Sequence, residues 1–569
     1  MNRFVSVSVG FSLPIALLLA GCAPSYYRKS ADRAAYSTIK EKTSRVPNMD
    51  PNFTIEQTNK VSLEGLPINT NAVAFLGEDG QREYGASIID LDKALEIAVK
   101  YSRGYQNEKE TLYLNGLELA ATRHAFTPLF TSRANGEFGG VTQKTLTYEA
   151  DPVTGEQKAV ISDTLEEQNY VSASGNIRFS WLMRDIGQLS ASLSTTFLRV
   201  LGGNQTPSTR LNATFIRPLL RDAGYKTQME ALTQGERTLL YQIRGFADYR
   251  REFSIGIATA FYRVLSARDS ARNNFANLES SRKNAERTRA LADEGRVTQS
   301  DLGRLAQQEL SAESAWINAV RNYQQSLDNF KLQLGLATEV NLVLDDTELE
   351  ALRINHPNVN LDESIKIALM ARLDFATSRD ELEDAERRVK LAANQLKPTV
   401  DFTSEVSLSS DPAKTAGIPL PQLDRYSYSA GLDVDPGLDK TNQRNTYRSA
   451  LISRERAVRS IAQQEDQIKV SVRDRWRELD SAKRNFEIAE IGVKLAERRV
   501  EEQTLLAELG RAKAQDQVDA QNDLLSSKNQ RTQALVTHTI ARLQFWSDMG
   551  ILYIKEDGQW QEVQSAKAN

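Results

Sequence analysis

Side chains suited to catalysis or metal binding are few and scattered in this sequence. Its three histidines, His124, His356 and His538, are far apart along the chain, and none has a cysteine or acidic neighbour at the spacing of a metal site. A Ser-His-Asp arrangement, a phosphate-binding glycine loop and a dinucleotide glycine pattern are also missing. The acidic run at 380–386 is expected to be a solvated helix face rather than a metal site. These observations predict a protein that is not an enzyme and binds no metal.

The single cysteine, Cys22, is placed for covalent chemistry of another kind. It follows a charged start and a short apolar segment, Phe11–Ala20, as in a bacterial secretion signal. The ending Leu19-Ala20-Gly21-Cys22 predicts cleavage before Cys22 and attachment of lipid to its thiol. Ala23, in place of an aspartate, favours delivery to the outer membrane. An ordinary secretion signal with an incidental cysteine is the alternative.

The composition sets further limits. At 569 residues the chain is longer than one ordinary core supports. Its net charge of −4, with 26% charged residues, gives no sign of nucleic-acid binding. Mean hydropathy is −0.47, and no run of about 18 apolar residues follows the signal segment, so no transmembrane helix is predicted. A membrane-spanning β-barrel stays possible, because half of its residues can be polar.

The sequence repeats itself once over its length. The pattern at Leu91–Ala98 returns at Leu361–Ala368, 270 residues later. The spacing between equivalent residues falls to 218 at Pro218 and Pro436. The first copy therefore carries 52 extra residues between Pro128 and Pro218, where an extracellular loop or another insertion is expected.

Each copy ends in a pattern typical of two long helices, and both segments lack proline. In the second copy, apolar residues step by three and four from Val458 to Val500, which is coiled-coil periodicity. This predicts a helix from about 440 to 507, roughly 100 Å long. Gly295 and Gly510 are expected to end the first long helix of each copy. Each copy should therefore form a helical hairpin with its tip at that glycine.

In the segments that precede these helices, apolar residues recur at every second position. In the second copy, Val400–Ser409 and Tyr426–Asp435 alternate apolar with small polar residues, and the first copy has more such runs. Alternation over about ten residues is typical of membrane-spanning strands. A soluble sheet with one buried face is the alternative. Few strands cannot enclose a lumen, and open edges are not tolerated in lipid, so spanning strands would require several chains to share one barrel.

Together these features resemble the TolC family of outer-membrane efflux proteins, over roughly residues 88–550. The resemblance rests on the repeat starts at Leu91 and Leu361, the strand-to-helix turns Arg217–Asp222 and Pro436–Asp439, the tip segments Gly295–Asp301 and Gly510–Asp516, and the stretch Asp519–Leu525.

The resemblance implies a trimer whose β-hairpins form one barrel in the outer membrane and whose helices form a tapering α-barrel across the periplasm. The expected fold class is mainly α with a transmembrane β part, built from two repeats of long coiled-coil helical hairpins plus β-hairpins. The expected divisions are a signal peptide at 1–21, a lipidated extended linker at 22–87, a first repeat at 88–335 with its β region at about 126–217 and its tip at 295, a linker at 336–360, a second repeat at 361–550 with its β-hairpin at about 399–435 and its tip at 510, and a tail at 551–569.

The resemblance also implies a passive exit duct, without cofactor, in a tripartite efflux or type I secretion system. The implied partners are two further copies of the chain, a periplasmic adaptor protein, an inner-membrane transporter and outer-membrane lipid, with no nucleic acid. The alternative is a lipid-tethered periplasmic coiled-coil scaffold without a pore. The two readings differ in whether the alternating strands lie in a membrane.

The family's functional residues carry over to the tips. Acidic residues six and nine places after the second tip glycine narrow the periplasmic aperture in the family. Here they are Asp516 and Asp519, one helical turn apart, and rings of three would favour cations. The resemblance also implies a latch between Arg511 and Asp301 of the neighbouring tip, although Ala507 lies where a latch tyrosine is expected. The implied adaptor contacts are Gly295, Arg296, Val297, Thr298, Gly510, Arg511, Ala512 and Lys513.

Overall fold

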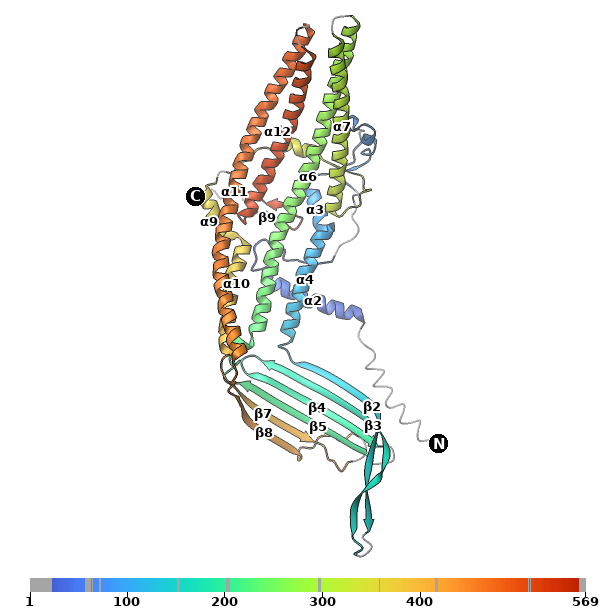
Figure 1. Ribbon diagram of the computed structural model, residues 1–569, viewed down its shortest axis with the longest axis vertical. Helices are drawn as coiled ribbons and strands as arrows, with labels where there is room; N and C mark the ends of the chain where they lie inside the picture. The colour runs from blue at the N-terminus through green and yellow to red at the C-terminus, as the bar shows by residue number, and fades with distance from the viewer. Residues whose placement is uncertain are drawn as a thin grey trace, which may run out of the picture. The chain divides into compact units, whose positions relative to one another are not determined.

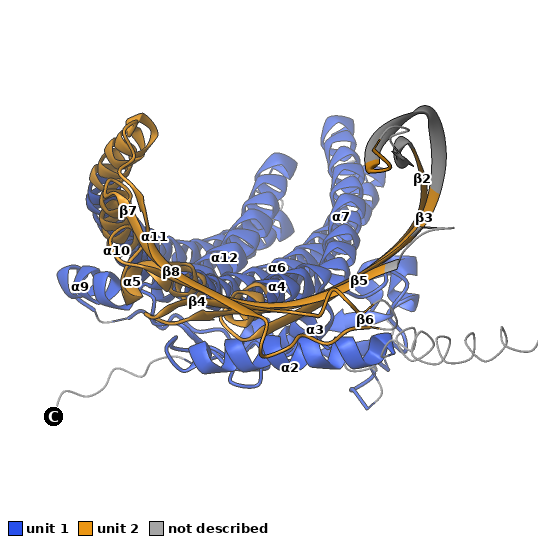
Figure 2. Cartoon of the chain, turned by 90° about the horizontal axis from the view of Figure 1, so that it is seen from below, with its two compact units in different colours: residues 1–117, 238–382, 457–569 blue, residues 118–237, 383–456 orange. Residues whose placement is uncertain are grey.

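The computed structural model describes residues 23–56, 63, 65–70, 73–150, 154–200, 205–294, 298–357, 359–414, 418–509, 511 and 513–561. Cys22 and the tip residues Gly295, Arg296, Val297, Gly510 and Ala512 lie outside these ranges. The chain divides into two compact units, which Figure 2 colours separately. The first unit comprises residues 1–117, 238–382 and 457–569, and the second comprises residues 118–237 and 383–456.

The internal repeat is preserved in the helices that open each copy. In the first copy, α3 (Leu91–Tyr101) is followed by α4 (Arg103–His124). In the second, α9 (Leu361–Ala371) is followed by α10 (Leu373–Asn394). All four pairs of helix bounds keep the spacing of 270 residues seen in the sequence. Both copies thus fold the same way, including a single-residue break between the two helices.

Side-chain caps fix the start of each copy. The Oδ1 atom of Asp90 accepts a hydrogen bond of 2.7 Å from the backbone N–H of Lys93, at the start of α3. At the start of α9, the Oδ1 atom of Asn360 accepts one of 3.0 Å from the N–H of Asp362. Such caps satisfy N–H groups that have no partner within the helix, so they define where each repeat begins.

Four long helices form the hairpins that the sequence predicts (Figure 1). They are α6 (Glu230–Asp293), α7 (Gln299–Leu334), α11 (Thr441–Glu508) and α12 (Ala514–Asp548). The bounds of α11 confirm the helix expected at about 440–507. Its buried residues follow the predicted heptad: Ile468, Val472, Leu479, Ala482, Val493 and Ala496. Within the described ranges, no helix is long and apolar enough to cross a membrane.

The segment at 22–87 is not the extended linker that was expected. It contains a helix, α2 (Pro24–Thr43), and a short 3-10 helix, η1 (Ala74–Gln81). Ile39 of α2 is buried and lies so close to Gly116 of α4 that a Cβ at that glycine would be 2.9 Å from the Ile39 side chain. Tertiary packing onto α4, rather than a clear period in the sequence, makes this segment helical, so the expectation of an extended strap is wrong for α2.

A six-stranded antiparallel sheet lies in the second unit, in the order β2-β3-β4-β5-β7-β8. Its strands are β2 (Leu129–Ala150), β3 (Gln157–Met183), β4 (Gly187–Val200), β5 (Gln205–Pro218), β7 (Thr399–Ser409) and β8 (Tyr426–Asp435). The first copy supplies four strands and the second copy two. The β2–β3 hairpin also continues beyond Tyr170, the last β3 residue paired with β4. The extra residues of the first copy thus add a strand pair and lengthen a hairpin.

The strand register keeps the two faces of the sheet distinct. Ile177 of β3 lies opposite Leu193 of β4, and the neighbouring pair is Asn176 with Ser194. The Nδ2 atom of Asn176 donates a hydrogen bond of 2.7 Å to the Oγ atom of Ser194. Because successive side chains in a strand point to opposite faces, one face collects apolar residues and the other polar ones. The alternation in the sequence predicts this arrangement.

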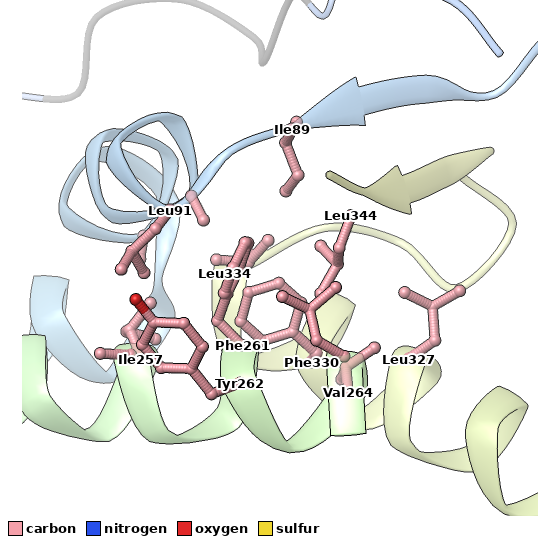
Figure 3. Packing of buried hydrophobic residues seen from close by; sticks show 14 of the residues in the cluster. Ile89, Leu91, Ile257, Phe261, Tyr262, Val264, Leu327, Phe330, Leu334 and Leu344 are labelled. Carbon is pink, nitrogen blue, oxygen red and sulfur yellow. The ribbon is translucent and has the colours of Figure 1, made fainter. Parts of the chain in front are cut away.

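A large apolar core lies in the first unit, where α6 and α7 pack under two short strands (Figure 3). Phe261 of α6 and Phe330 of α7 are buried, and their ring centroids are 6.0 Å apart. Above them, β1 (Ser87–Ile89) pairs in parallel with β6 (Leu342–Leu344). The remaining short elements are α5 (Tyr225–Gln228), α8 (Thr347–Ala351), β9 (Tyr553–Ile554) and β10 (Trp560–Gln561).

Two equivalent glycines fix the ends of α7 and α12. Gly335 and Gly550 both have a positive φ, 81° and 74°. A Cβ on Gly335 would be 2.0 Å from the carbonyl oxygen of Tyr101, and one on Gly550 would be 3.1 Å from that of Ala371. These carbonyls end α3 and α9. Each return helix is therefore fixed against the first helix of its own repeat, at a contact that only glycine permits.

Candidate functional site

At the first tip, Thr298 caps the start of α7. Its Oγ1 atom accepts a hydrogen bond of 3.2 Å from the backbone N–H of Asp301 and donates one of 2.6 Å to the Oδ2 atom of the same residue. The carboxylate of Asp301 lies in the first turn of α7, where the helix dipole favours negative charge. Asp301 therefore already has a role within its own chain, which is to hold the start of the return helix.

The second tip differs, because Lys513 at the start of α12 provides no side-chain cap. The backbone N–H of Arg511 donates a hydrogen bond of 2.8 Å to the carbonyl of Leu506 and so closes the end of α11. The side chains of Arg511 and Lys513 are exposed. Two cationic side chains are thus available at the surface of this tip.

Asp516 and Asp519 lie on one face of α12, in its first turn and a half. Both are half-buried, and a spacing of three residues places them one above the other. The Nε2 atom of Gln515 donates a hydrogen bond of 2.8 Å to the Oδ1 atom of Asp519. Two carboxylates in this arrangement attract cations, and three copies around an axis would form two stacked acidic rings.

A ladder of amide side chains, which the sequence analysis missed, joins α12 to the other hairpin. The Nη1 atom of Arg304 donates to the Oε1 atom of Gln515 at 3.4 Å, and the Nε2 atom of Gln308 donates to the Oδ1 atom of Asn522 at 3.0 Å. Farther from the tip, Asn529 accepts a hydrogen bond of 2.9 Å from Asn273. The available signal was that Gln515, Asn522 and Asn529 recur every seven residues.

Comparison with known proteins gives structural matches alone. No family model matches this chain, and no curated protein does either. The outer-membrane channel OprN superposes with a TM-score of 0.56 at 13% identity, over 88% of this chain and 98% of OprN. CusC, whose structures describe transmembrane channel formation, gives 0.57 at 13% identity, over 81% of this chain and 93% of CusC. The outer membrane protein VceC from Vibrio cholerae superposes with a TM-score of 0.56 at 14% identity, over 81% of this chain and 96% of VceC.

This chain has the outer-membrane channel fold. The superpositions span nearly the full length of each channel, so they include the helical hairpins as well as the sheet. The resemblance read from the repeat, the turns and the tips is confirmed at the level of the fold. The expected class, mainly α with a β part, is confirmed with it.

For a chain with the outer-membrane channel fold, the latch between Arg511 and Asp301 stays a prediction. Among the described residues of one chain, no ion pair joins these two side chains. The expected latch lies between neighbouring copies, whereas the single chain shows Asp301 bonded to Thr298. Arg511 would therefore have to compete with, or add to, the hydrogen bond from that threonine.

The acidic run at 380–386 is not simply the solvated face that was expected. Asp384 is only 2% exposed, and its carboxylate pairs with the Nε atom of Arg237 at 2.6 Å and the Nη1 atom of Arg387 at 2.7 Å. Arg387 also lies 3.2 Å from Glu230. Arginines on α6 and α10 neutralise the buried charge, which is how a protein interior tolerates a carboxylate. Glu381, Glu383 and Glu386 are exposed as expected, whereas the burial of Asp384 could not be predicted, because sequence alone does not reveal which helix faces this run.

The structure brings together two of the three histidines, although they are far apart in the sequence. The ring centroids of His356 and His538 are 6.0 Å apart. Burial, together with the positive charge of the neighbouring His356, Arg542 and Lys483, lowers the pKa of His538 to about 4. No group of three or more metal-binding side chains gathers there or elsewhere in the described part of the chain.

Proposed function

We propose that this chain is the outer-membrane component of a tripartite efflux or type I secretion system. It acts as a passive exit duct that spans the outer membrane and the periplasm. One observation carries the proposal. This chain has the outer-membrane channel fold, and it combines a two-faced antiparallel sheet with hairpins of very long helices. In a tethered scaffold without a pore, the exposed apolar face of the sheet would lie in water, which is unfavourable.

The exposed apolar face of the sheet supports a position in lipid. Phe130 is 73% exposed, Tyr428 77% and Leu432 63%, and the strand register places all three on the same face. Exposed apolar surface of this kind is costly in water and favourable in a bilayer. The opposite face, which carries serine, threonine and asparagine, then lines an aqueous lumen.

Exposed apolar residues on the helices support assembly with further copies of the chain. Ile488, Ile491 and Leu495 of α11 are each more than half exposed. Such residues on a long amphipathic helix are suited to packing against another helix. In a trimer, the hairpins of three copies complete the α-barrel, and the three sheets complete the membrane barrel.

The tips would meet the periplasmic adaptor, which is itself attached to an inner-membrane transporter. We assign this contact to 295–298 and 510–513. The carboxylates of Asp516 and Asp519 would form the narrowest ring, with a preference for cations. Cys22 would carry the lipid that anchors the mature N-terminus to the outer membrane.

Planar-bilayer conductance of the detergent-extracted protein tests the proposal, with the oligomer mass measured on the same sample. A trimer that gives discrete, long-lived conductance steps supports it. A trimer that conducts only after Asp516 and Asp519 are replaced by alanine also supports it, as a duct closed at its tips. A monomer that extracts without detergent once Cys22→Ser removes the lipid site would contradict it and leave the tethered scaffold.

A further inference from the structure

The six-stranded sheet ends in two strands that each pair on one side alone, β2 at one edge and β8 at the other. Figure 2 shows the strands of this sheet following an arc. Every neighbouring pair in the sheet is antiparallel, and the number of strands is even. The two edge strands therefore run in opposite directions. Since β8 and β2 are antiparallel, β8 of one copy is able to pair with β2 of the next in the same pattern as the rest of the sheet.

We propose that β8 of each copy pairs with β2 of the next copy, so that three six-stranded sheets close into one barrel of eighteen strands. In this seam Asp433 lies opposite Arg133. The inference rests on the trimeric channel proposed above and deepens it, because it specifies how the copies join and how wide the membrane part is. Closure also removes the open edges that lipid does not tolerate.

The internal repeat and the two faces of the sheet together indicate the register of the seam. Within the chain, β5 ends the first repeat and pairs with β7, which begins the second. The last residue of β5, Pro218, lies opposite the third residue of β7, Asp401. At the seam, β8 ends the second repeat and β2 begins the first, so their roles are equivalent. Because Pro436 is the equivalent of Pro218 and Thr131 that of Asp401, the repeat places the end of β8 beside the start of β2 to within one residue. Of the neighbouring registers that keep the apolar face continuous, the one with Asp435 opposite Thr131 also pairs Tyr428 with Phe138.

This register matches side chains on both faces of the sheet. On the polar face it places Asp433 directly opposite Arg133, and both are exposed in the single chain. On the apolar face it places Tyr428 opposite Phe138, which are 77% and 68% exposed. Opposite charges and aromatic pairs are favourable when directly opposed across strands. A slip of one residue would instead place apolar residues opposite polar ones.

A like-charge pair within the chain gives the seam a further reason to form. Asp433 of β8 lies directly opposite Asp401 of β7, and like charges in such a position repel. Arg133 from the next copy would supply the missing cation. Glu137, an acidic residue on the same face of β2, would lie opposite Ser429, and its carboxylate already accepts a hydrogen bond of 3.2 Å from Tyr170.

The extra strand pair of the first repeat determines the width of the barrel. If both repeats supplied two strands, three copies would give twelve. Because barrel diameter grows roughly linearly with strand number, eighteen strands enclose a cross-section about twice as large. A barrel of this size holds an open aqueous channel. The membrane end therefore admits bulky solutes, and the helical tips alone set the size limit of the duct.

Disulfide trapping in the full-length protein tests the seam. Asn135 and Gly431 lie opposite each other on the lumen face in the proposed register, where an oxidant in water reaches both. We expect oxidation of Asn135→Cys/Gly431→Cys to convert most of the monomer band to covalent dimer and trimer. Either single variant, which retains Cys22, should stay monomeric on a denaturing gel. The pair Asn135→Cys/Ser429→Cys, displaced by one register step, should cross-link several-fold less.

Each outcome of this experiment has a definite meaning. A cross-link between Gly431→Cys and Ser194→Cys of different copies would overturn the proposal, because it would place β4 rather than β2 at the seam. Absence of the 135–431 link in a sample that is trimeric and conducts would also overturn it, while the channel function would stand. A monomeric sample that never conducts would instead contradict the proposed function. As a second test, Arg133→Asp should weaken the trimer, and adding Asp433→Arg should restore it.

Discussion

The hydroxyl of Tyr323 donates a hydrogen bond to Glu83 across 240 residues of sequence, and the two oxygen atoms are 2.6 Å apart. The Nη2 atom of Arg268 donates to the other carboxylate oxygen at 3.0 Å. All three side chains are buried. Burial raises the pKa of Glu83, and the charge of Arg268 opposes that shift. One carboxylate thus ties the segment before α3 to both helices of the first hairpin.

Removing the tyrosine hydroxyl should weaken this tie without changing the packing of the ring. We expect Tyr323→Phe to destabilise the protein by about 1–3 kcal/mol, because a buried carboxylate oxygen loses its donor. The measurement is the midpoint of urea unfolding. Tyr84→Phe is the matched control, since Tyr84 adjoins Glu83 in the sequence and is 62% exposed. Equal effects of the two substitutions would contradict a stabilising role for this hydrogen bond.

Gly335 should not tolerate a side chain. Alanine there would combine a positive φ with a Cβ placed 2.0 Å from the carbonyl of Tyr101. We expect Gly335→Ala to lower the free energy of unfolding by at least about 2 kcal/mol. Gly303 of α7 has open space around it, so Gly303→Ala should be neutral or stabilising by up to about 1 kcal/mol. Thermal melts of both variants test the difference, and similar melts would refute it.

The buried His538 should make the protein sensitive to acid. Its pKa in the folded protein is about 4, below the ordinary value of 6.5, so the unfolded chain takes up the proton first as pH falls. The stability that depends on neutral His538 is full above pH 6.5 and is lost as pH falls toward 4. We expect the drop in unfolding free energy between pH 7 and pH 4.5 to be smaller in His538→Gln, by about 2–3 kcal/mol.

The control for this pH dependence is His124→Gln, because His124 is exposed. Urea titrations at several pH values between 7 and 4.5 measure the effect in both variants. If the free energy of unfolding falls equally with pH in His538→Gln and in the unmodified protein, another group is responsible for the acid sensitivity.

Replacing both aperture carboxylates should change conduction. We expect Asp516→Ala/Asp519→Ala to raise single-channel conductance several-fold and to reduce cation preference, because two acidic rings are removed. Asp466→Ala serves as the control, since Asp466 is a well-exposed acidic residue on α11. Reversal potentials in a salt gradient measure the selectivity. If conductance and selectivity match those of the unmodified protein, the aperture assignment is wrong.

Much of the fold follows from local patterns in the sequence. The repeat at Leu91 and Leu361 predicts the paired opening helices, and the heptad from Val458 to Val500 predicts α11, because burial of one helical face leaves a periodic record. Apolar and polar residues alternate at Val400–Ser409, and this predicts β7, because the two faces of a strand meet different environments.

Contacts between elements that are distant in the sequence could not be predicted, because local periodicity carries no information about which elements pack together. The ion pair between Asp384 and Arg237, and the proximity of His356 and His538, arise from neighbours distant in the sequence. The four strands of the first copy could be counted only once their pairing was known. At the site, the spacing of Asp516 and Asp519 could be predicted, whereas the bond that occupies Asp301 could not.

The contact of Gly335 with Tyr101 has a mechanical consequence. The backbone of Gly335 lies close against the carbonyl of Tyr101, and that of Gly550 close against the carbonyl of Ala371. A shift of α7 or α12 along its axis would therefore be opposed by contact between backbone atoms. If α7 tilts, we expect it to pivot about this fixed end, with the rest of the helix as a rigid lever. From Gly335 to the start of α7 the lever is about 50 Å long, so a tilt of about 5° moves its free end by about 4–5 Å. Small rotations at the fixed end suffice to widen or narrow an opening at the other.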